Sequence, residues 1–282
     1  MNDLIFFSLI MLIFLRAVGL GVSVEFFYNT RDRKFISFIF CWIFWMIANI
    51  FPILADIVLN MSLKEIFLIV NILFFILGVI FYFWGFWQYY LIISSRILIA
   101  LIIISIITPL LLYILIDFNI AMTFSTMIIM LLFLSGYIIP PLKKREFVKY
   151  MGKTIRWYYA ATVTFVLYFP ISIISYTLGY RYGVYFAEEP LIIILYYIPS
   201  LGITLLLIVL LVHIEYSISS RHKNDLKDKY SHDLGNIMQA ISSAYELYSL
   251  KLENIKGSAE LDNMLKSKIT EAGKLIKDIR EL

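Results

Sequence analysis

The sequence is poor in cysteine and in charge, and it has no glycine-rich nucleotide loop. Cys41 is the only cysteine among 282 residues, so neither a disulfide framework nor a cysteine metal cluster can form within the chain. Charged residues make up 16% of the chain, and the formal net charge of +4 is spread over several segments, which argues against a nucleic-acid-binding surface. The lack of a Walker-type loop excludes a P-loop nucleotide site.

Apolar residues, in contrast, make up 61% of the chain and aromatic residues 17%, which is more than a soluble domain can bury. A membrane-spanning helix needs about 20 consecutive apolar residues. Seven stretches satisfy this requirement: Leu4–Phe27, Phe35–Leu59, Ile66–Leu91, Ile97–Ile116, Ile120–Ile139, Trp157–Leu178 and Leu191–Ile214. The sequence therefore predicts an all-α fold with a seven-helix transmembrane bundle followed by a polar tail.

The distribution of Lys and Arg between the connections predicts the orientation of the bundle. The first, third and fifth connections are basic: Arg31, Arg33, Lys34, Arg96, Lys143, Lys144, Arg145, Lys149, Lys153 and Arg156. The second, fourth and sixth hold only Lys64 and Arg181, beside acidic residues. Because basic connections stay in the cytoplasm, we expect an outer N-terminus and a cytoplasmic tail in a prokaryotic cell membrane. The outer connections are too short for a separate ligand-binding domain.

Polar residues inside the apolar stretches are candidate sensor residues, because such groups are costly in lipid. They are Arg16, Glu25, Asp56 and Asn71. Arg16 lies near the middle of the first stretch, and two interpretations stay open. It binds an anionic ligand or a lipid headgroup, or it braces the bundle by pairing with backbone carbonyls and with Tyr or Asn side chains such as Asn49 or Asn71. Glu25 and Glu215 are expected near the inner membrane surface, beside arginines of the connections.

The third apolar stretch ends in a dense aromatic run from Phe81 to Tyr90. Trp and Tyr are enriched where a helix crosses the boundary between lipid and water. We therefore predict an interfacial belt for this run rather than a ligand cage.

The last apolar stretch passes into the tail without a helix breaker. Between Gly202 and Gly235 there is neither proline nor glycine, so one helix can continue from the membrane into the tail. We divide the chain into a sensor domain over 1–216, a signalling helix over 217–229 and a hairpin over 230–282. A rotation or sliding of the last span would reach the hairpin directly.

The tail carries two amphipathic segments whose apolar residues alternate in steps of three and four, the spacing of helices that pack in bundles. The seams are Tyr230, Leu234, Ile237, Ile241, Ala244 and Tyr248, then Leu261, Leu265, Ile269, Ala272, Ile276 and Ile279. Gly257 suits the end of one helix and Ser258 the start of the next. Two such helices bury little alone, so we expect an antiparallel hairpin that dimerises through 230–282 into a four-helix bundle.

Outside the first seam, His232, Asn236 and Gln239 share one face of the helix, which is expected to face water. The run His-Asp-Leu-Gly-Asn that starts at His232 resembles the phospho-accepting box of sensor histidine kinases. It is most similar to the box of archaeal membrane-linked kinases. The resemblance covers residues 222–282.

The resemblance implies a role for each polar residue of the box. His232 would accept phosphate, and Asp233 would act as the general base beside it. Asn236 would position water for dephosphorylation, and Gln239 is a further candidate on the same face. Phosphate would then pass to an aspartate of a response-regulator receiver domain in a two-component system.

Two positions depart from the commonest form of this box. Gly235 stands where a larger residue is common, and Ile237 stands where a proline is usual. Kinases of this family also need a domain that binds ATP and Mg²⁺, with an asparagine box and a glycine-rich lid, and the sequence contains neither motif. We therefore expect no cofactor in this chain and no self-phosphorylation, because the chain is truncated or because the catalytic half is another polypeptide. Its classification as an enzyme stays open.

A second interpretation is a seven-span transporter or receptor whose tail is only a coiled-coil dimerisation element. It predicts uptake or binding that does not depend on His232. The apolar stretches show no repeat between the two halves of the membrane part, which disfavours a transporter. On either interpretation the expected partners are the lipid bilayer and a second copy of the chain, without nucleic acid or metal.

Overall fold

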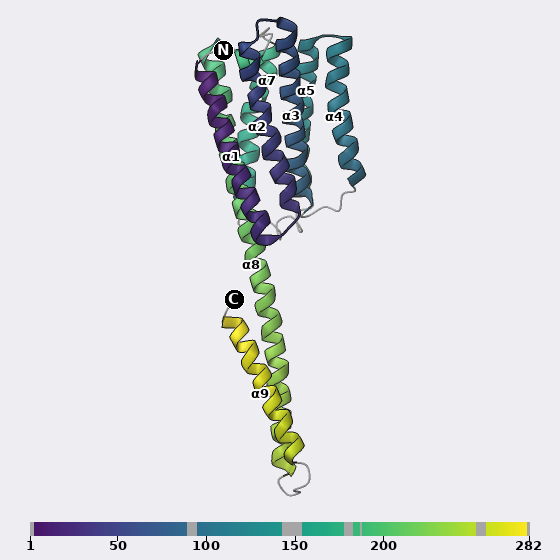
Figure 1. Ribbon diagram of the computed structural model, residues 1–282, viewed down its shortest axis with the longest axis vertical. Coiled ribbons are helices and arrows are strands. Elements are labelled where there is room, and N and C mark those ends of the chain that lie inside the picture. Colours follow the sequence, from purple (N-terminus) through teal and green to yellow (C-terminus); the bar gives the residue numbers. More distant parts are fainter. Residues whose placement is uncertain are drawn as a thin grey trace. The chain divides into compact units, whose positions relative to one another are not determined.

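The computed structural model describes residues 3–88, 95–142, 154–177, 183–186, 188–251 and 258–280, and these fold into helices with short connections (Figure 1). The α-helices are α1 Asp3–Thr30, α2 Lys34–Ile57, α3 Met61–Trp87, α4 Ser95–Leu115, α5 Phe118–Leu142, α7 Ile155–Thr177, α8 Pro190–Lys251 and α9 Ser258–Arg280. A short 3-10 helix, η2, covers Gly183–Phe186. The predicted all-α fold is confirmed for these residues.

The chain separates into two compact units, Met1–Ser217 and Ile218–Leu282. The first unit contains α1 to α5, α7, η2 and the apolar part of α8. The second contains the polar part of α8 together with α9. α8 is one helix from Pro190 to Lys251. The lack of proline and glycine between Gly202 and Gly235 accounts for this continuity at the junction of the units.

Six helical segments among the described residues are long and apolar enough to cross a membrane, which indicates a multi-pass membrane protein. They are Asp3–Thr30, Lys34–Ile57, Met61–Trp87, Arg96–Leu115, Phe118–Gly136 and Pro190–Tyr216. Residues 157–177 of the remaining predicted stretch, Trp157–Leu178, belong to α7, and Leu178 lies outside the described residues. α7 is not among the six segments, and several of its side chains are not described. The seventh crossing stays a prediction.

Two tryptophans of α2 fix its packing against α1 and α3. Trp42 donates its Nε1–H to the hydroxyl of Ser23 on α1 at 3.0 Å, and Trp45 donates its Nε1–H to the carbonyl of Phe75 on α3 at 3.1 Å. A side chain at Gly78 would clash with the ring of Trp45, so the close approach of α2 and α3 needs glycine there. These three helices form the part of the unit that holds Arg16.

The aromatic run at the end of α3 packs partly into the bundle, with Phe81 and Trp84 half-buried, and its predicted place at the membrane boundary stays a prediction. Tyr82, Phe83, Phe86 and Trp87 are each at most 7% exposed. Phe83 lies edge-on to Phe133 of α5, with ring centroids 5.2 Å apart, and Phe86 stacks on Tyr158 of α7 at 5.7 Å. A run that is aromatic on every face of the helix does not reveal which face lipid covers. Residues 89–90 lie outside the described residues.

In the second unit, α9 runs in the direction opposite to α8 (Figure 1). Ile237 of α8 and Ala272 of α9 are buried, whereas Ile269 and Ile276 of α9 are 57% and 43% exposed. Among the described side chains, a single hairpin therefore buries only part of the apolar seam. The expected turn before Ser258 and the side chains of Ala244, Tyr248, Leu261, Leu265 and Ile279 lie outside the description.

Candidate functional site

The polar row of the tail lies on the exposed face of α8. The side chain of His232 is 74% exposed, and Asn236 and Gln239 are exposed as well. Leu234 is half-buried and Ile237 is buried. The helix thus turns its apolar residues inward and presents the imidazole to solvent, as the position of His232 outside the seam indicated.

Two neighbouring side chains contact the same ring nitrogen of His232. Nδ1 lies 3.5 Å from Oδ1 of Asp233 and 3.3 Å from Nδ2 of Asn236, which is one turn further along α8. Because both contacts are made at Nδ1 and the side chain is mostly exposed, Nε2 is the nitrogen that a reactant from solvent can reach.

The proton on the imidazole decides which neighbour Nδ1 bonds. If Nδ1 carries the proton, it faces the carboxylate of Asp233 at 3.5 Å and can donate to it, and the lone pair then lies on Nε2. A bare Nδ1 accepts from the amide of Asn236, and Nε2 then carries the proton. Only the first arrangement leaves Nε2 nucleophilic. Asp233 and Asn236 thus favour opposite tautomers of the ring.

Open space surrounds Gly235 in the middle of this polar row. A Cβ atom built on Gly235 would meet nothing within 4 Å. Glycine inside a helix costs about 1 kcal/mol relative to alanine. Packing among the described residues therefore does not explain this glycine, and the space beside it is open.

A second polar centre lies in the first unit, around Arg16 of α1. The side chain is 3% exposed, and its Nη1 donates a hydrogen bond of 2.6 Å to the carbonyl of Trp45 on α2. The guanidinium carbon lies 5.6 Å from the ring centroids of both Trp45 and Phe75, which is within cation–π range. Of the pairings considered for Arg16, the one with a backbone carbonyl is present. Asn71 instead donates its Nδ2–H to the carbonyl of Ala48 at 2.7 Å.

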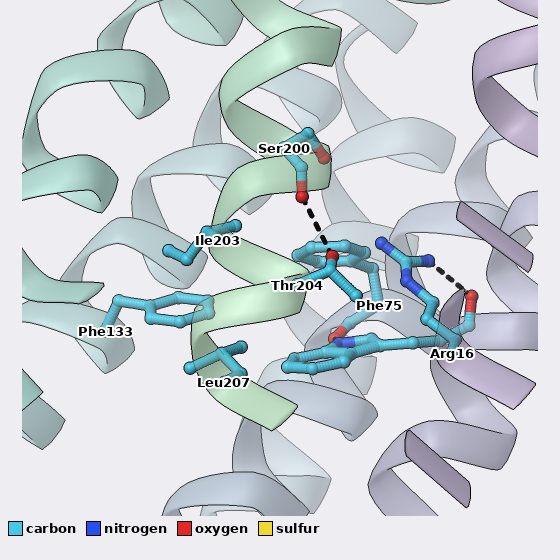
Figure 2. A pocket seen from close by; sticks show the side chains of 8 residues that line it. Arg16, Phe75, Phe133, Ser200, Ile203, Thr204 and Leu207 are labelled. Carbon is cyan, nitrogen blue, oxygen red and sulfur yellow. Dashed lines mark hydrogen bonds between the residues drawn. The ribbon is translucent and has the colours of Figure 1, made fainter. Parts of the chain in front are cut away.

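A small cavity adjoins Arg16 (Figure 2). Its described lining is Arg16, Trp45, Phe75, Phe133, Ser200, Ile203, Thr204 and Leu207. The volume of about 10 Å³ has room for about one water molecule. The hydroxyl of Thr204 donates to the carbonyl of Ser200 one turn earlier, at 2.8 Å. Half of the lining residues belong to α8, so this helix forms one wall of the cavity.

The short helix η2 lies close to the same centre. Val184 is buried, and its carbonyl accepts a hydrogen bond from the hydroxyl of Tyr197 on α8 at 3.4 Å. Burial raises the pKa of Tyr185, and the positive charge of Arg16 acts in the opposite direction. Tyr185 is therefore within electrostatic reach of Arg16, and η2 belongs to the surroundings of the cavity.

The other candidate sensor residues lie elsewhere. Glu25 and Asp56 are exposed, and neither is among the described residues that line the cavity. Glu25 of α1 is within electrostatic reach of Glu215 of α8. Asn71 is fully buried, and it braces α3 against α2 through the carbonyl of Ala48. Arg16 alone of the four candidates lines the cavity.

Sequence reasoning missed Ser200 and Thr204. Hydroxyl residues are common in membrane helices, where they bond to their own backbone, so neither residue attracts attention alone. A signal was nevertheless present, because Pro199 lies inside α8 directly before Ser200. A proline beside two hydroxyl residues one turn apart indicates an irregular and polar part of an apolar helix.

Neither polar centre has the composition of a metal site. Among the described residues, no group of three or more His, Cys, Asp or Glu side chains is placed to hold a metal ion. Comparisons with protein-family models, with curated proteins and with solved structures give no match to the chain. The two centres are therefore interpreted from their residues and their geometry.

Proposed function

We propose that the chain is the sensory and phosphate-accepting part of a membrane histidine kinase in a two-component system. The observation that carries the proposal is the setting of His232, whose side chain is 74% exposed and whose Nδ1 contacts both Asp233 and Asn236. A histidine whose role is packing is buried. An exposed histidine whose only role is to keep the helix soluble needs no polar side chains beside one of its ring nitrogens. The setting suits transfer of a phosphoryl group to Nε2.

In the proposed reaction, Nε2 of His232 attacks the γ-phosphorus of ATP. The bond between that phosphorus and the bridging oxygen of ADP breaks, and a nitrogen–phosphorus bond forms. Asp233 accepts the hydrogen bond from Nδ1, keeps the lone pair on Nε2 and balances the positive charge that develops on the ring. ATP and Mg²⁺ are brought by a catalytic domain that docks beside the box, where Gly235 leaves space.

The phosphoryl group then passes to an aspartate of a response-regulator receiver domain. Asn236 acts in the reverse direction, because its amide lies one turn from the ring and can orient a water molecule toward the phosphorus. Gln239 lies on the same exposed face and is a further contact for the receiver domain.

The proposed working unit is a homodimer through residues 230–282. Ile269 and Ile276 continue the seam that buries Ala272, yet they are 57% and 43% exposed in one chain. A second hairpin would cover both residues and complete a four-helix bundle. This supports the dimer expected from the spacing of the seams.

The course of α8 supports direct transmission from the membrane part. One helix contains both the apolar segment Pro190–Tyr216 and His232. A continuous helix transmits rotation or sliding, whereas a flexible linker absorbs it. With the basic connections inside, the tail lies in the cytoplasm of a prokaryotic cell, where ATP and a response regulator are present.

Phosphorylation of the full chain in nanodiscs tests the proposal. A histidine-kinase catalytic domain is added in trans with radiolabelled ATP, and we expect an acid-labile label on the chain. The label should fall to background in His232→Gln. The matched control is His222→Gln, which removes another histidine of α8 and should keep the label. Label that persists in His232→Gln would remove the assignment and favour a transporter or receptor whose tail only dimerises.

A further inference from the structure

We propose that the cavity beside Arg16 binds a small inorganic anion of about the size of chloride. The described lining carries one formal charge, the guanidinium of Arg16, and it contains no carboxylate. The other lining side chains are aromatic, aliphatic or hydroxyl groups. A positive charge among such residues attracts an anion more strongly than it would in water, because apolar and aromatic side chains screen it less.

The surrounding residues hold the guanidinium in place before any ligand arrives. Its Nη1 is bonded to the carbonyl of Trp45 at 2.6 Å, and the rings of Trp45 and Phe75 lie 5.6 Å from its central carbon. These contacts fix the plane in which the five N–H donors of an arginine lie. In Figure 2, Arg16 extends toward the segment of α8 that carries Ser200 and Thr204. A donor that is already oriented binds an anion with little loss of side-chain freedom.

α8 supplies the hydroxyl side of the site. Ser200 and Thr204 are buried and line the cavity one turn apart. A serine hydroxyl can donate a hydrogen bond to an anion while the arginine supplies the charge.

The size of the cavity selects among the anions that Arg16 could attract. A volume of about 10 Å³ admits an occupant about as large as one water molecule. A lipid headgroup or an organic acid is far larger than this. Of the ligands that the sequence left open for Arg16, the structure therefore favours the smallest, a single inorganic ion.

An anion at this site would contact the helix that carries His232. Ser200, Ile203, Thr204 and Leu207 all belong to α8, whereas Arg16 belongs to α1. A bound anion would tie these two helices together and stabilise one position of α8. This effect on signalling rests on the proposed function, but the binding does not.

Bromide quenching of tryptophan fluorescence tests the binding in the full chain, because Trp45 lines the cavity and bromide is a quencher close to chloride in size. Protein in nanodiscs is titrated with sodium bromide, and sodium gluconate, whose anion is too large for the cavity, keeps the ionic strength constant. We expect the quenching to have a saturable component from Trp45. Exposed tryptophans such as Trp157, which is 39% exposed, should add a component that rises linearly with the bromide concentration. Chloride should also raise the midpoint of thermal unfolding relative to gluconate, because a ligand stabilises the state that binds it.

Substitutions assign the response to the cavity. Arg16→Gln should abolish the saturable component and the chloride effect. Arg16→Gln also removes the hydrogen bond that braces α1 against α2, so a second variant is needed. Ser200→Val keeps the bond from Arg16 to the Trp45 carbonyl and fills the cavity with a methyl group. It should lower the bromide affinity by about tenfold or more, through lost space and a lost donor. Trp157→Phe is the matched control and should reduce only the linear component.

Purely linear quenching of the wild type, or a saturable component unchanged in Ser200→Val, would overturn the proposal. His232→Gln should leave bromide binding intact. A wild-type chain that binds bromide but takes up no label at His232 would contradict the signalling function alone, whereas a wild-type chain that is labelled at His232 but shows only linear quenching would contradict the anion site alone.

Discussion

Arg16 and His232 show how differently the two units of the chain use a nitrogen-bearing side chain. Arg16 is 3% exposed and donates to the backbone of a neighbouring helix. His232 is 74% exposed and contacts side chains of its own helix. An unsatisfied polar group costs several kcal/mol in lipid, so the membrane environment draws such groups to carbonyls. In water a polar group without a protein partner is hydrated instead, so a ring nitrogen of His232 can stay accessible to a reactant.

Other polar residues of the first unit follow the same rule as Arg16. Several donate to backbone carbonyls: Ser8 to Leu4, Ser23 to Gly19, Asn71 to Ala48, Ser125 to Ala121, Thr126 to Met122 and Thr204 to Ser200. Arg16 and Asn71 bond to carbonyls of a neighbouring helix and brace the bundle, whereas the hydroxyl groups in this list bond to carbonyls of their own helix.

The largest expected effect is on the stability of the first unit and concerns Trp45, which holds Arg16 in place. Trp45→Ala removes a buried ring that contacts Arg16 and Phe75 and bonds to the Phe75 carbonyl, so we expect it to lower the free energy of unfolding by about 3–5 kcal/mol. Unfolding by a denaturing detergent in mixed micelles measures this. Trp157→Ala removes a ring that is 39% exposed and should cost less than half as much. Equal losses would show that the burial of Trp45 is not what stabilises the unit.

The exposed seam of α9 gives the next largest effect. Ile269→Ser combined with Ile276→Ser should weaken the proposed homodimer by about 2–4 kcal/mol, or about 30- to 700-fold in its dissociation constant, because both side chains would lose the apolar contacts that the proposal gives them. Energy transfer between labelled full-length chains in nanodiscs measures the exchange. Asn263→Ser with Lys277→Ser alters exposed residues of the same helix and should leave association unchanged. A double seam variant that associates like the wild type would argue against pairing through this face.

A smaller effect separates the two neighbours of His232. Asn236→Ala should reduce dephosphorylation by about tenfold and leave phosphorylation within about twofold, because the amide contacts Nδ1 and not the attacking Nε2. Single-turnover decay of the labelled chain measures the first rate, and its formation measures the second. Ser242→Ala, at another exposed position of α8, is the control. Equal loss of both rates would contradict the role given to Asn236.

The smallest expected effect concerns Gly235. Gly235→Ala should stabilise the tail by up to about 1 kcal/mol, because alanine favours the helix and its Cβ meets nothing within 4 Å. Gly273→Ala in α9 has equally open surroundings and should act alike. Thermal unfolding followed by circular dichroism measures both variants. If Gly235→Ala alone also slows phosphorylation by an added catalytic domain, the space beside His232 is used for docking, whereas destabilisation by Gly235→Ala would contradict the open geometry.

The helical fold could be predicted from the sequence because two strong patterns dominate it. Long apolar stretches indicated the six segments that are long and apolar enough to cross a membrane, and the lack of breakers after Gly202 indicated the continuous α8. The placement of the aromatic run of α3 could not be predicted, because Tyr82, Phe83 and Phe86 are apolar enough for either lipid or the bundle core. Their burial depends on contacts with α2, α5 and α7, which are distant in the sequence.

The two polar centres differed in how much the sequence revealed. His232 and Asn236 lie one turn apart on one helix, so the helical repeat alone predicted that they share a face, and Asp233 is adjacent in the sequence. The cavity beside Arg16 combines residues of five helices, and its carbonyl partner belongs to Trp45, whose side chain gave no hint of that role. Local spacing thus predicts a site within one helix, whereas a site between helices needs the packed structure.

The central claim, that His232 presents a reactive Nε2 to solvent, is tested most directly by phosphoramidate, a small phosphoryl donor that needs no catalytic domain. The full chain has three histidines, and mass spectrometry can follow the phosphorylation of each one over time. Of the other two, His213 stacks on Trp157 with ring centroids 5.7 Å apart, and His222 provides a second internal comparison. The account predicts that His232 is phosphorylated first and that Asp233→Asn slows it. Phosphorylation of His213 or His222 at the same rate or faster would contradict it.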